Sequence, residues 1–201
     1  MSTRVWLRLA SLYGGLVLFG VSMALLVRSR LGLDPWDVLH QGLARRLDLP
    51  LGWVVIAVSV LVLLVWIPLR QRPGLGTVSN VVLVGLVVDV ALPVLPGPSA
   101  LAARSVFLVG GVVLNAVATA LYIGARFGPG ARDGLMTGLA RRGHSIRLVR
   151  SLIEISVLLA GWLLGGTVGV GTLLYAASIG PLVHLLLPRL SISDGPERTD
   201  T

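Results

Sequence analysis

Six charged, amide or imidazole side chains lie within otherwise apolar stretches of the sequence, and they are the residues that could carry chemistry: Asn80, Asp89, Asn115, Arg150, Glu154 and His184. Glu154 stands nearly two turns inside the stretch 148–164, with Arg150 one turn before it. A carboxylate inside a membrane helix can couple to a proton or a cation. A glutamate four residues from an arginine can equally form a local ion pair. The sequence leaves both interpretations open.

The other polar residues of these stretches are also candidates for a path through the membrane. Asn80 and Asn115 lie in the stretches 75–95 and 105–125, where an amide side chain either bonds to a neighbouring helix or contacts a solute. Asp89 and His184 occupy positions near the ends of two stretches. Each of these two residues either lines a vestibule or extends to the nearer membrane surface.

A further polar group begins a short helix. Asp34 suits the N-cap, Pro35 the first helical position, and Asp37 the positive end of the helix dipole. The predicted helix, 35–46, is too short to cross a bilayer, and its amphipathic pattern favours an interfacial helix with Trp36 at the headgroup level. Asp37 then either pairs with Arg45 or faces a water-filled vestibule as part of a re-entrant gate.

Two glycine-rich segments start later helices with the pattern Gly-x-Gly-Thr: Gly74 and Gly76 in one, Gly169 and Gly171 in the other. Exposed amides at a helix N-terminus can bind an anion. Glycines also let two helices approach closely. Because so short a pattern is a weak signal, we favour packing and keep anion binding as the alternative.

These residues need elements that hold them in a bilayer. The chain of 201 residues is 55% hydrophobic and only 13% charged, whereas a soluble domain is about 25% charged. A bilayer crossing needs roughly 20 apolar residues. We therefore predict an all-α, polytopic membrane protein whose six transmembrane helices cover 9–27, 51–69, 75–95, 105–125, 148–164 and 170–188.

The sequence also contains an internal repeat, with a spacing of 96 residues that becomes 95 after one deletion. The segment RLGLDPWDVLHQGLARR, 30–46, matches RFGPGARDGLMTGLARR, 126–142, so that Asp133 corresponds to Asp37 and either pairs with Arg141 or faces the vestibule. Each copy contains three spans, an odd number, so the second copy must enter the membrane from the opposite side. Inverted repeats of this kind are typical of transporters.

The repeat gives the predicted organisation of the chain. Repeat 1 covers 4–95 with its interfacial helix at 35–46, repeat 2 covers 100–188 with its interfacial helix at 131–142, and 189–201 is a polar tail. With the N-terminus inside, twelve arginines lie on the inner side and five on the outer side. This bias predicts that both termini lie in the cytoplasm.

Several classes of function are not expected. The chain has no cysteine, and its three histidines are far apart, so we predict no catalytic residues, no metal site and no cofactor. The net charge of +8 comes from arginines beside helix ends, which indicates membrane orientation and not nucleic-acid binding. We therefore do not expect an enzyme.

Two motifs resemble the YczE-type bacterial integral membrane proteins, a loose grouping of YczE, YyaS and YitT. The first matching motif is Gly32, Pro35, Trp36 and Asp37, and the second is Gly74, Gly76, Thr77, Asn80, Gly85 and Asp89. The resemblance covers nearly the whole chain. It implies a bacterial cytoplasmic-membrane protein and brings no substrate or reaction with it.

The leading hypothesis is a small permease-like transporter of an unknown solute, with alternating access between the two halves. Because six helices make only a thin wall around a path, the hypothesis includes a homodimer. Its path residues would be Glu154, Asn80, Asn115, Asp89, Asp37, Asp133 and His184. The alternative is a non-transporting membrane partner that docks a cytoplasmic enzyme or ATPase through the arginine-rich segment 126–150. In both cases the bilayer is the principal partner.

Overall fold

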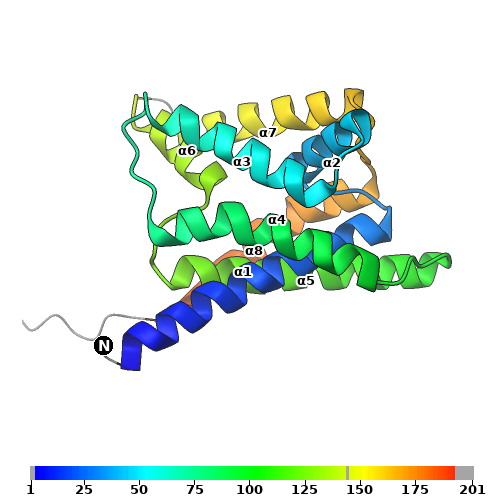
Figure 1. Ribbon diagram of the computed structural model, residues 1–201, viewed down its shortest axis with the longest axis horizontal. Coiled ribbons are helices and arrows are strands. Elements are labelled where there is room, and N and C mark those ends of the chain that lie inside the picture. The colour runs from blue at the N-terminus through cyan, green and yellow to red at the C-terminus, as the bar shows by residue number, and fades with distance from the viewer. Residues whose placement is uncertain (1–2, 144, 193–201) are drawn as a thin grey trace, which may run out of the picture.

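The computed structural model describes residues 3–143 and 145–192, and every regular element in this part of the chain is a helix (Figure 1). The helices are α1 (Thr3–Ser29), α2 (Pro35–Leu47), α3 (Leu51–Trp66), α4 (Leu75–Val94), α5 (Leu101–Gly124), α6 (Ala131–Ala140), α7 (Ile146–Leu163) and α8 (Val170–Leu190). The predicted all-α class is therefore confirmed.

The helices form two layers (Figure 1). In one layer α1 packs against α4 and α5, and α5 packs against α8. In the other layer α2 packs against α3 and α7, and α6 packs against the same two helices. The layers meet chiefly where α3 packs along α4, whereas α7 has no comparable packing with α8 among the described residues. We call the α3–α4 contact the closed seam and the α7–α8 side the open seam.

Glycines bring the backbones together at the closed seam. A Cβ atom on Gly52 would overlap the carbonyl oxygen of Gly85, and the amide of Gly52 donates to Asp89 Oδ1 at 2.7 Å. At the open seam the residues 95 positions later are Arg147 and Gly180, and a Cβ atom on Gly180 would meet nothing within 4 Å. The bulky arginine replaces the glycine that close packing requires.

The first helices of the two repeats cross-connect at their ends. Arg8, near the start of α1, donates through Nε to the carbonyl of Ala125 at 2.9 Å, just after the end of α5. Arg104, near the start of α5, donates through Nε to the carbonyl of Ser29 at 2.8 Å, at the end of α1. The helices α1 and α5 therefore run antiparallel, and the two bonds involve residues 96 positions apart.

A second reciprocal pair of bonds joins the glycine-rich helix starts to the opposite repeat. The amide of Gly76 donates to the carbonyl of Phe127, and the amide of Gly171 donates to the carbonyl of Leu31, both at 2.8 Å. Gly32 and Gly128, next to these acceptors, have positive φ angles of 125° and 118°. Glycine adopts this backbone conformation without steric cost. Because the amides of Gly76 and Gly171 already donate to protein carbonyls, the structure favours the packing interpretation over anion binding.

Four helices, α1, α4, α5 and α8, are long and apolar enough to cross a membrane. The helices α2 and α3 bend by 117° at a short break, and a fifth crossing results if this pair is one span. The predicted span 51–69 ends as a 16-residue helix at Trp66, shortly before Pro68. The helix α7 carries Arg147, Arg150 and Glu154 within 18 residues, so it is too charged for this group.

The short helices α2 and α6 begin inside the protein. Asp34 caps α2 by accepting from the amide of Asp37 at 2.8 Å, as its position before Pro35 predicts. The expectation that Trp36 anchors this helix at the headgroup level is wrong, because Trp36 is only 6% exposed and packs in a cluster with Trp66. A helix that starts in the core brings its first turn to the centre of the molecule.

Candidate functional site

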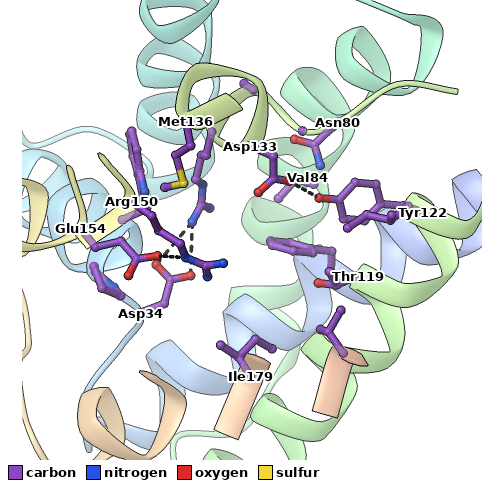
Figure 2. A pocket seen from close by; sticks show the side chains of 18 of the residues that line it. Asp34, Asn80, Val84, Thr119, Tyr122, Asp133, Met136, Arg150, Glu154 and Ile179 are labelled. Carbon is purple, nitrogen blue, oxygen red and sulfur yellow. Dashed lines mark hydrogen bonds and ion pairs between the residues drawn. The ribbon is translucent and has the colours of Figure 1, made fainter. Parts of the chain in front are cut away.

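A central cavity of about 340 Å³ lies between the two layers (Figure 2). All eight helices contribute to its wall. Its polar and charged lining residues are Asp34, Ser59, Asn80, Thr119, Tyr122, Arg132, Asp133, Arg150, Glu154, Tyr175 and His184. The first turns of α2 and α6 both belong to the wall, because these helices begin in the core.

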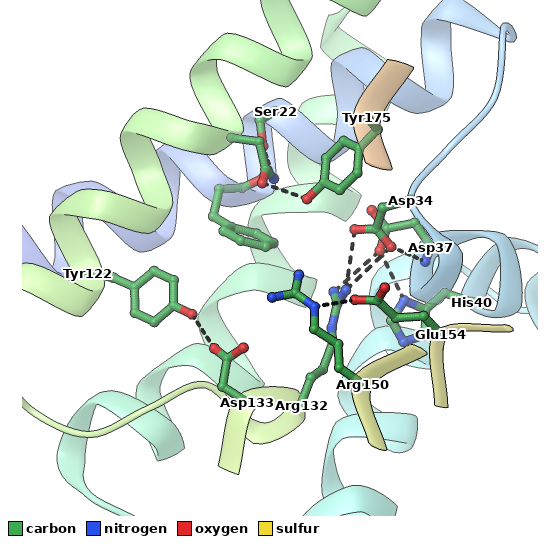
Figure 3. A network of polar contacts seen from close by, with 12 residues as sticks. Ser22, Asp34, Asp37, His40, Tyr122, Arg132, Asp133, Arg150, Glu154 and Tyr175 are labelled. Carbon is green, nitrogen blue, oxygen red and sulfur yellow. Dashed lines mark hydrogen bonds and ion pairs between the residues drawn. The ribbon is translucent and has the colours of Figure 1, made fainter. Parts of the chain in front are cut away.

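Arg132 connects the starts of the two short helices. Its guanidinium lies 3.3 Å from Asp34 Oδ2 and 3.4 Å from Asp37 Oδ1, so one cation serves two carboxylates (Figure 3). The side chains of Asp34 and Asp37 are 3% and 0% exposed. The same guanidinium lies 5.6 Å from the centre of the Trp36 ring, within the range of a cation–π contact. This ion-pair network fixes α2 against α6.

Two polar atoms near this network have no hydrogen-bond partner in the described part of the chain. They are Asp37 Oδ2 and Trp36 Nε1, and both are buried. The other oxygen of Asp37 lies 3.3 Å from His40 Nδ1. Asp37 therefore pairs with Arg132 and His40, and the expected pair with Arg45 is wrong. Arg45 instead donates to Gly165 and Thr167 on the opposite repeat.

Arg150 and Glu154 form the local ion pair that their spacing predicts. Arg150 Nε donates to Glu154 Oε1 at 2.8 Å, and both side chains lie on the cavity wall (Figure 2). Their side chains are 56% and 32% exposed, so the pair is accessible from the cavity. Glu154 therefore forms the ion pair and also lines the cavity, so both interpretations of this residue stay open.

Asp133 occupies the opposite side of the cavity (Figure 3). Its Oδ2 accepts a hydrogen bond from the hydroxyl of Tyr122 at 2.9 Å. The expected pair with Arg141 is therefore wrong, and the side chain points into the bundle as the vestibule alternative required. The ring of Tyr122 contacts Phe19 edge to face, with centroids 6.2 Å apart.

The remaining predicted path residues divide into two groups. Asn80 and His184 line the cavity. Asn115 is 1% exposed and bonds between helices: its amide nitrogen donates to Ser22 and its oxygen accepts from Tyr175, each at 2.9 Å. Asp89 accepts from the start of α3 in the closed seam and is not among the wall residues. Asn115 and Asp89 thus have structural partners.

Sequence reasoning missed the central role of Arg132. Its signal was present, because a basic residue in the first turn of a helix opposes the helix dipole and needs a local reason. The carboxylates of Asp34 and Asp37 supply that reason. Tyr122 and Tyr175 gave no comparable signal, because a tyrosine within an apolar helix is equally typical of packing or of the membrane interface.

The wall carries groups of both charges. Within the described ranges, no group of three or more His, Cys, Asp or Glu residues could hold a metal ion. The wall combines three carboxylates, two guanidinium groups and several aromatic rings. Such a mixture can hold a small charged molecule by ion pairing and ring contacts.

Comparisons with known proteins place most of the chain in one group. A family profile described as "Family of unknown function (DUF6198)" matches residues 6–188. An "Uncharacterized protein" of Haemophilus influenzae is 45% identical over 173 residues, which are 86% of this chain and 79% of the relative. No solved structure matches the chain.

Two relatives come from Bacillus subtilis. The "Uncharacterized membrane protein YczE" is 30% identical over 192 residues, covering 94% of this chain and 89% of the relative. The "Uncharacterized protein YyaS" is 28% identical over 184 residues, covering 88% and 90%. Together with the apolar helices, these similarities support a multi-pass membrane location.

Proposed function

Since this chain belongs to the DUF6198 family of unknown function and to the YczE-type proteins, we propose from its geometry that it is a small permease-like membrane transporter. The observation that carries the proposal is the central cavity, which both repeats line with charged side chains between two helix layers. A soluble partner protein could not reach such a site, whereas a small solute could.

The paired contacts support an inverted repeat. The antiparallel α1 and α5 exchange equivalent arginine bonds, and the two glycine-rich helix starts exchange equivalent amide bonds. A two-fold axis in the membrane plane would produce such pairs. In this proposal the six crossings are α1, α4, α5 and α8 together with the shorter α3 and the more charged α7. Transporters with this architecture bind solutes near the bilayer midplane, where the halves meet.

The two seams support alternating access. One layer packs on the other through α3 and α4, while α7 and α8 have no comparable contact among the described residues. If each repeat adopted the arrangement that the other has now, α3 would separate from α4, and α7 would pack against α8. Closing the open seam would bury Arg147 and Arg150, which requires compensating negative charge because an unpaired buried ion costs several kcal/mol. Glu154 already supplies one such charge.

Flux through the purified protein tests this proposal. The full chain would be reconstituted into liposomes on a solid-supported membrane, and currents would be recorded for a panel of small organic cations and anions. We expect a transient current for at least one solute. Glu154→Gln should reduce that current, whereas Asp48→Asn, a change at the exposed end of α2, should not.

The competing role predicts a different result. If no solute on the panel produces a current and the protein purifies with a soluble partner in a fixed ratio, a docking role for the segment 126–150 replaces transport. The proposal also places the protein in the bacterial inner membrane with both termini in the cytoplasm, as the arginine distribution favours.

A further inference from the structure

We infer that the central cavity binds a lipophilic organic cation and that Asp133 provides its counter-charge. This inference deepens the proposed transport function, on which it rests for its physiological role, by naming the class of solute. Four observations carry it: the balance of charge on the wall, the position of Asp133, the aromatic lining and the opening between α7 and α8.

The charge balance of the cavity is negative. Its wall contains the carboxylates of Asp34, Asp133 and Glu154 but only the guanidinium groups of Arg132 and Arg150. A fourth carboxylate, Asp37, lies directly behind the wall against Arg132. An uncompensated charge in a medium of low dielectric constant is expensive in free energy. An occupant with a positive charge would offset this excess, whereas an anion would increase it.

Asp133 is the wall carboxylate that has no ion pair in the described part of the chain. Glu154 pairs with Arg150, while Asp34 and Asp37 share Arg132. Asp133 has no ion pair within 4.0 Å in the part of the chain that the structure describes, and its bond comes from the neutral hydroxyl of Tyr122. Figure 3 shows this pair on the other side of the space from Asp34 and Asp37, with the guanidinium of Arg150, already paired with Glu154, between them. A carboxylate without an ion pair partner therefore faces the space that a ligand would fill.

Aromatic rings stand around the same space. Phe19 and Tyr122 form an edge-to-face pair on the wall, and Tyr175 lines it from α8. The faces of such rings attract cations, and organic ammonium or phosphonium groups exploit this attraction without a shell of oxygen ligands. A metal ion would need that shell, and the described residues contain no suitable group. The lining thus favours an organic cation over a metal ion.

The open seam provides a route from the bilayer. Gly180 and His184 belong to the cavity wall and are also exposed, and Gly180 has no neighbour that a Cβ atom would meet within 4 Å. The helices beside this opening expose large apolar side chains, including Leu152 and Leu185, as lipid-facing helices do. A solute that enters here must be soluble in hydrocarbon, so we specify a lipophilic cation.

Two probes of matched shape test the sign of the charge. Tetraphenylphosphonium and tetraphenylborate have the same four phenyl groups and opposite charges. Equilibrium binding of each would be measured with the purified full chain in detergent, using radiolabelled or spectroscopically detected probe. We expect saturable binding of the phosphonium at one site per chain, and only unsaturable partitioning of the borate.

Variants then assign the site. Asp133→Asn keeps the size of the side chain and its ability to accept from Tyr122 but removes its charge. We expect it to weaken phosphonium binding at least about tenfold, because a charge–charge attraction at close range in the protein exceeds 1.4 kcal/mol. Asp48→Asn removes one carboxylate at the exposed end of α2 and should leave binding unchanged.

Two results would overturn the inference: equal saturable binding of the borate that is lost in Arg150→Gln, or unchanged phosphonium binding in folded Asp133→Asn. If Asp133→Asn does not fold, Phe19→Leu replaces it, with an expected several-fold loss from the missing ring. Binding without any current would sustain the cation site and reject transport, whereas currents without phosphonium binding would do the reverse.

Discussion

Removing the guanidinium of Arg132 should destabilise the protein more than removing that of Arg150. Arg132→Met keeps much of the apolar stem but leaves Asp34 and Asp37 as buried carboxylates without a cation. Breaking a buried ion pair by removing one partner costs about 3–5 kcal/mol. Because the side chain of Arg132 is itself 24% exposed, we expect the lower end of this range, about 3 kcal/mol.

The free energy of unfolding would be measured by titrating SDS into the protein in mixed micelles and recording far-ultraviolet circular dichroism. Arg150→Met is the matched control. Both side chains of the Arg150–Glu154 ion pair are partly exposed, so this pair should contribute less than about 1 kcal/mol. Replacing Asp34 and Asp37 by asparagine in the Arg132→Met background should recover most of the lost stability, since the uncompensated charges are then absent.

The reasoning fails if Arg132→Met costs no more than Arg150→Met. It also fails if the two asparagine substitutions bring no recovery, because the loss would then come from packing against Trp36 and not from charge. Either result would mean that the ion-pair network does not hold α2 against α6.

Three further changes test the packing around the cavity. Gly134→Ala places a Cβ atom in the ring of Trp66 and should cost about 1–3 kcal/mol in the same SDS titration, with a wild-type midpoint contradicting the contact. Tyr175→Phe leaves the buried oxygen of Asn115 without its donor, for an expected loss of about 1–3 kcal/mol, and no loss would mean that another donor replaces it. Asp89→Ala removes the acceptor for the first turn of α3, and hydrogen exchange of that turn should accelerate while the first turn of α7 stays unchanged.

The sequence allowed the helical class and most helix starts to be predicted, because these depend on local patterns. Asp34 before Pro35 specified an N-cap, and the structure has the bond. Arg150 and Glu154 specified an ion pair by their spacing alone. The periodicity of apolar residues gave the eight helices approximate bounds, but it could not say which crossings would be shortened or bent.

The errors share one physical origin, which is contact between distant parts of the chain. Asp37 was assigned Arg45 and Asp133 was assigned Arg141 because those residues are close in sequence, yet the partners are Arg132 and Tyr122. Burial of a helix start cannot be read from an amphipathic pattern, since the polar side of such a helix can face either water or an internal ion pair. For the same reason the amphipathic pattern did not reveal that Trp36 is buried.

The antiparallel arrangement of the two repeats is the claim on which the transport proposal depends, and side-specific labelling tests it most directly. The natural chain has no cysteine, so single cysteines at Arg46, in the last turn of α2, and at Arg142, the equivalent position just after α6, give an unambiguous reading. A membrane-impermeant maleimide applied to intact cells should label one position at once and the other only after the membrane is permeabilised. Labelling of both from the same side would contradict the inverted arrangement.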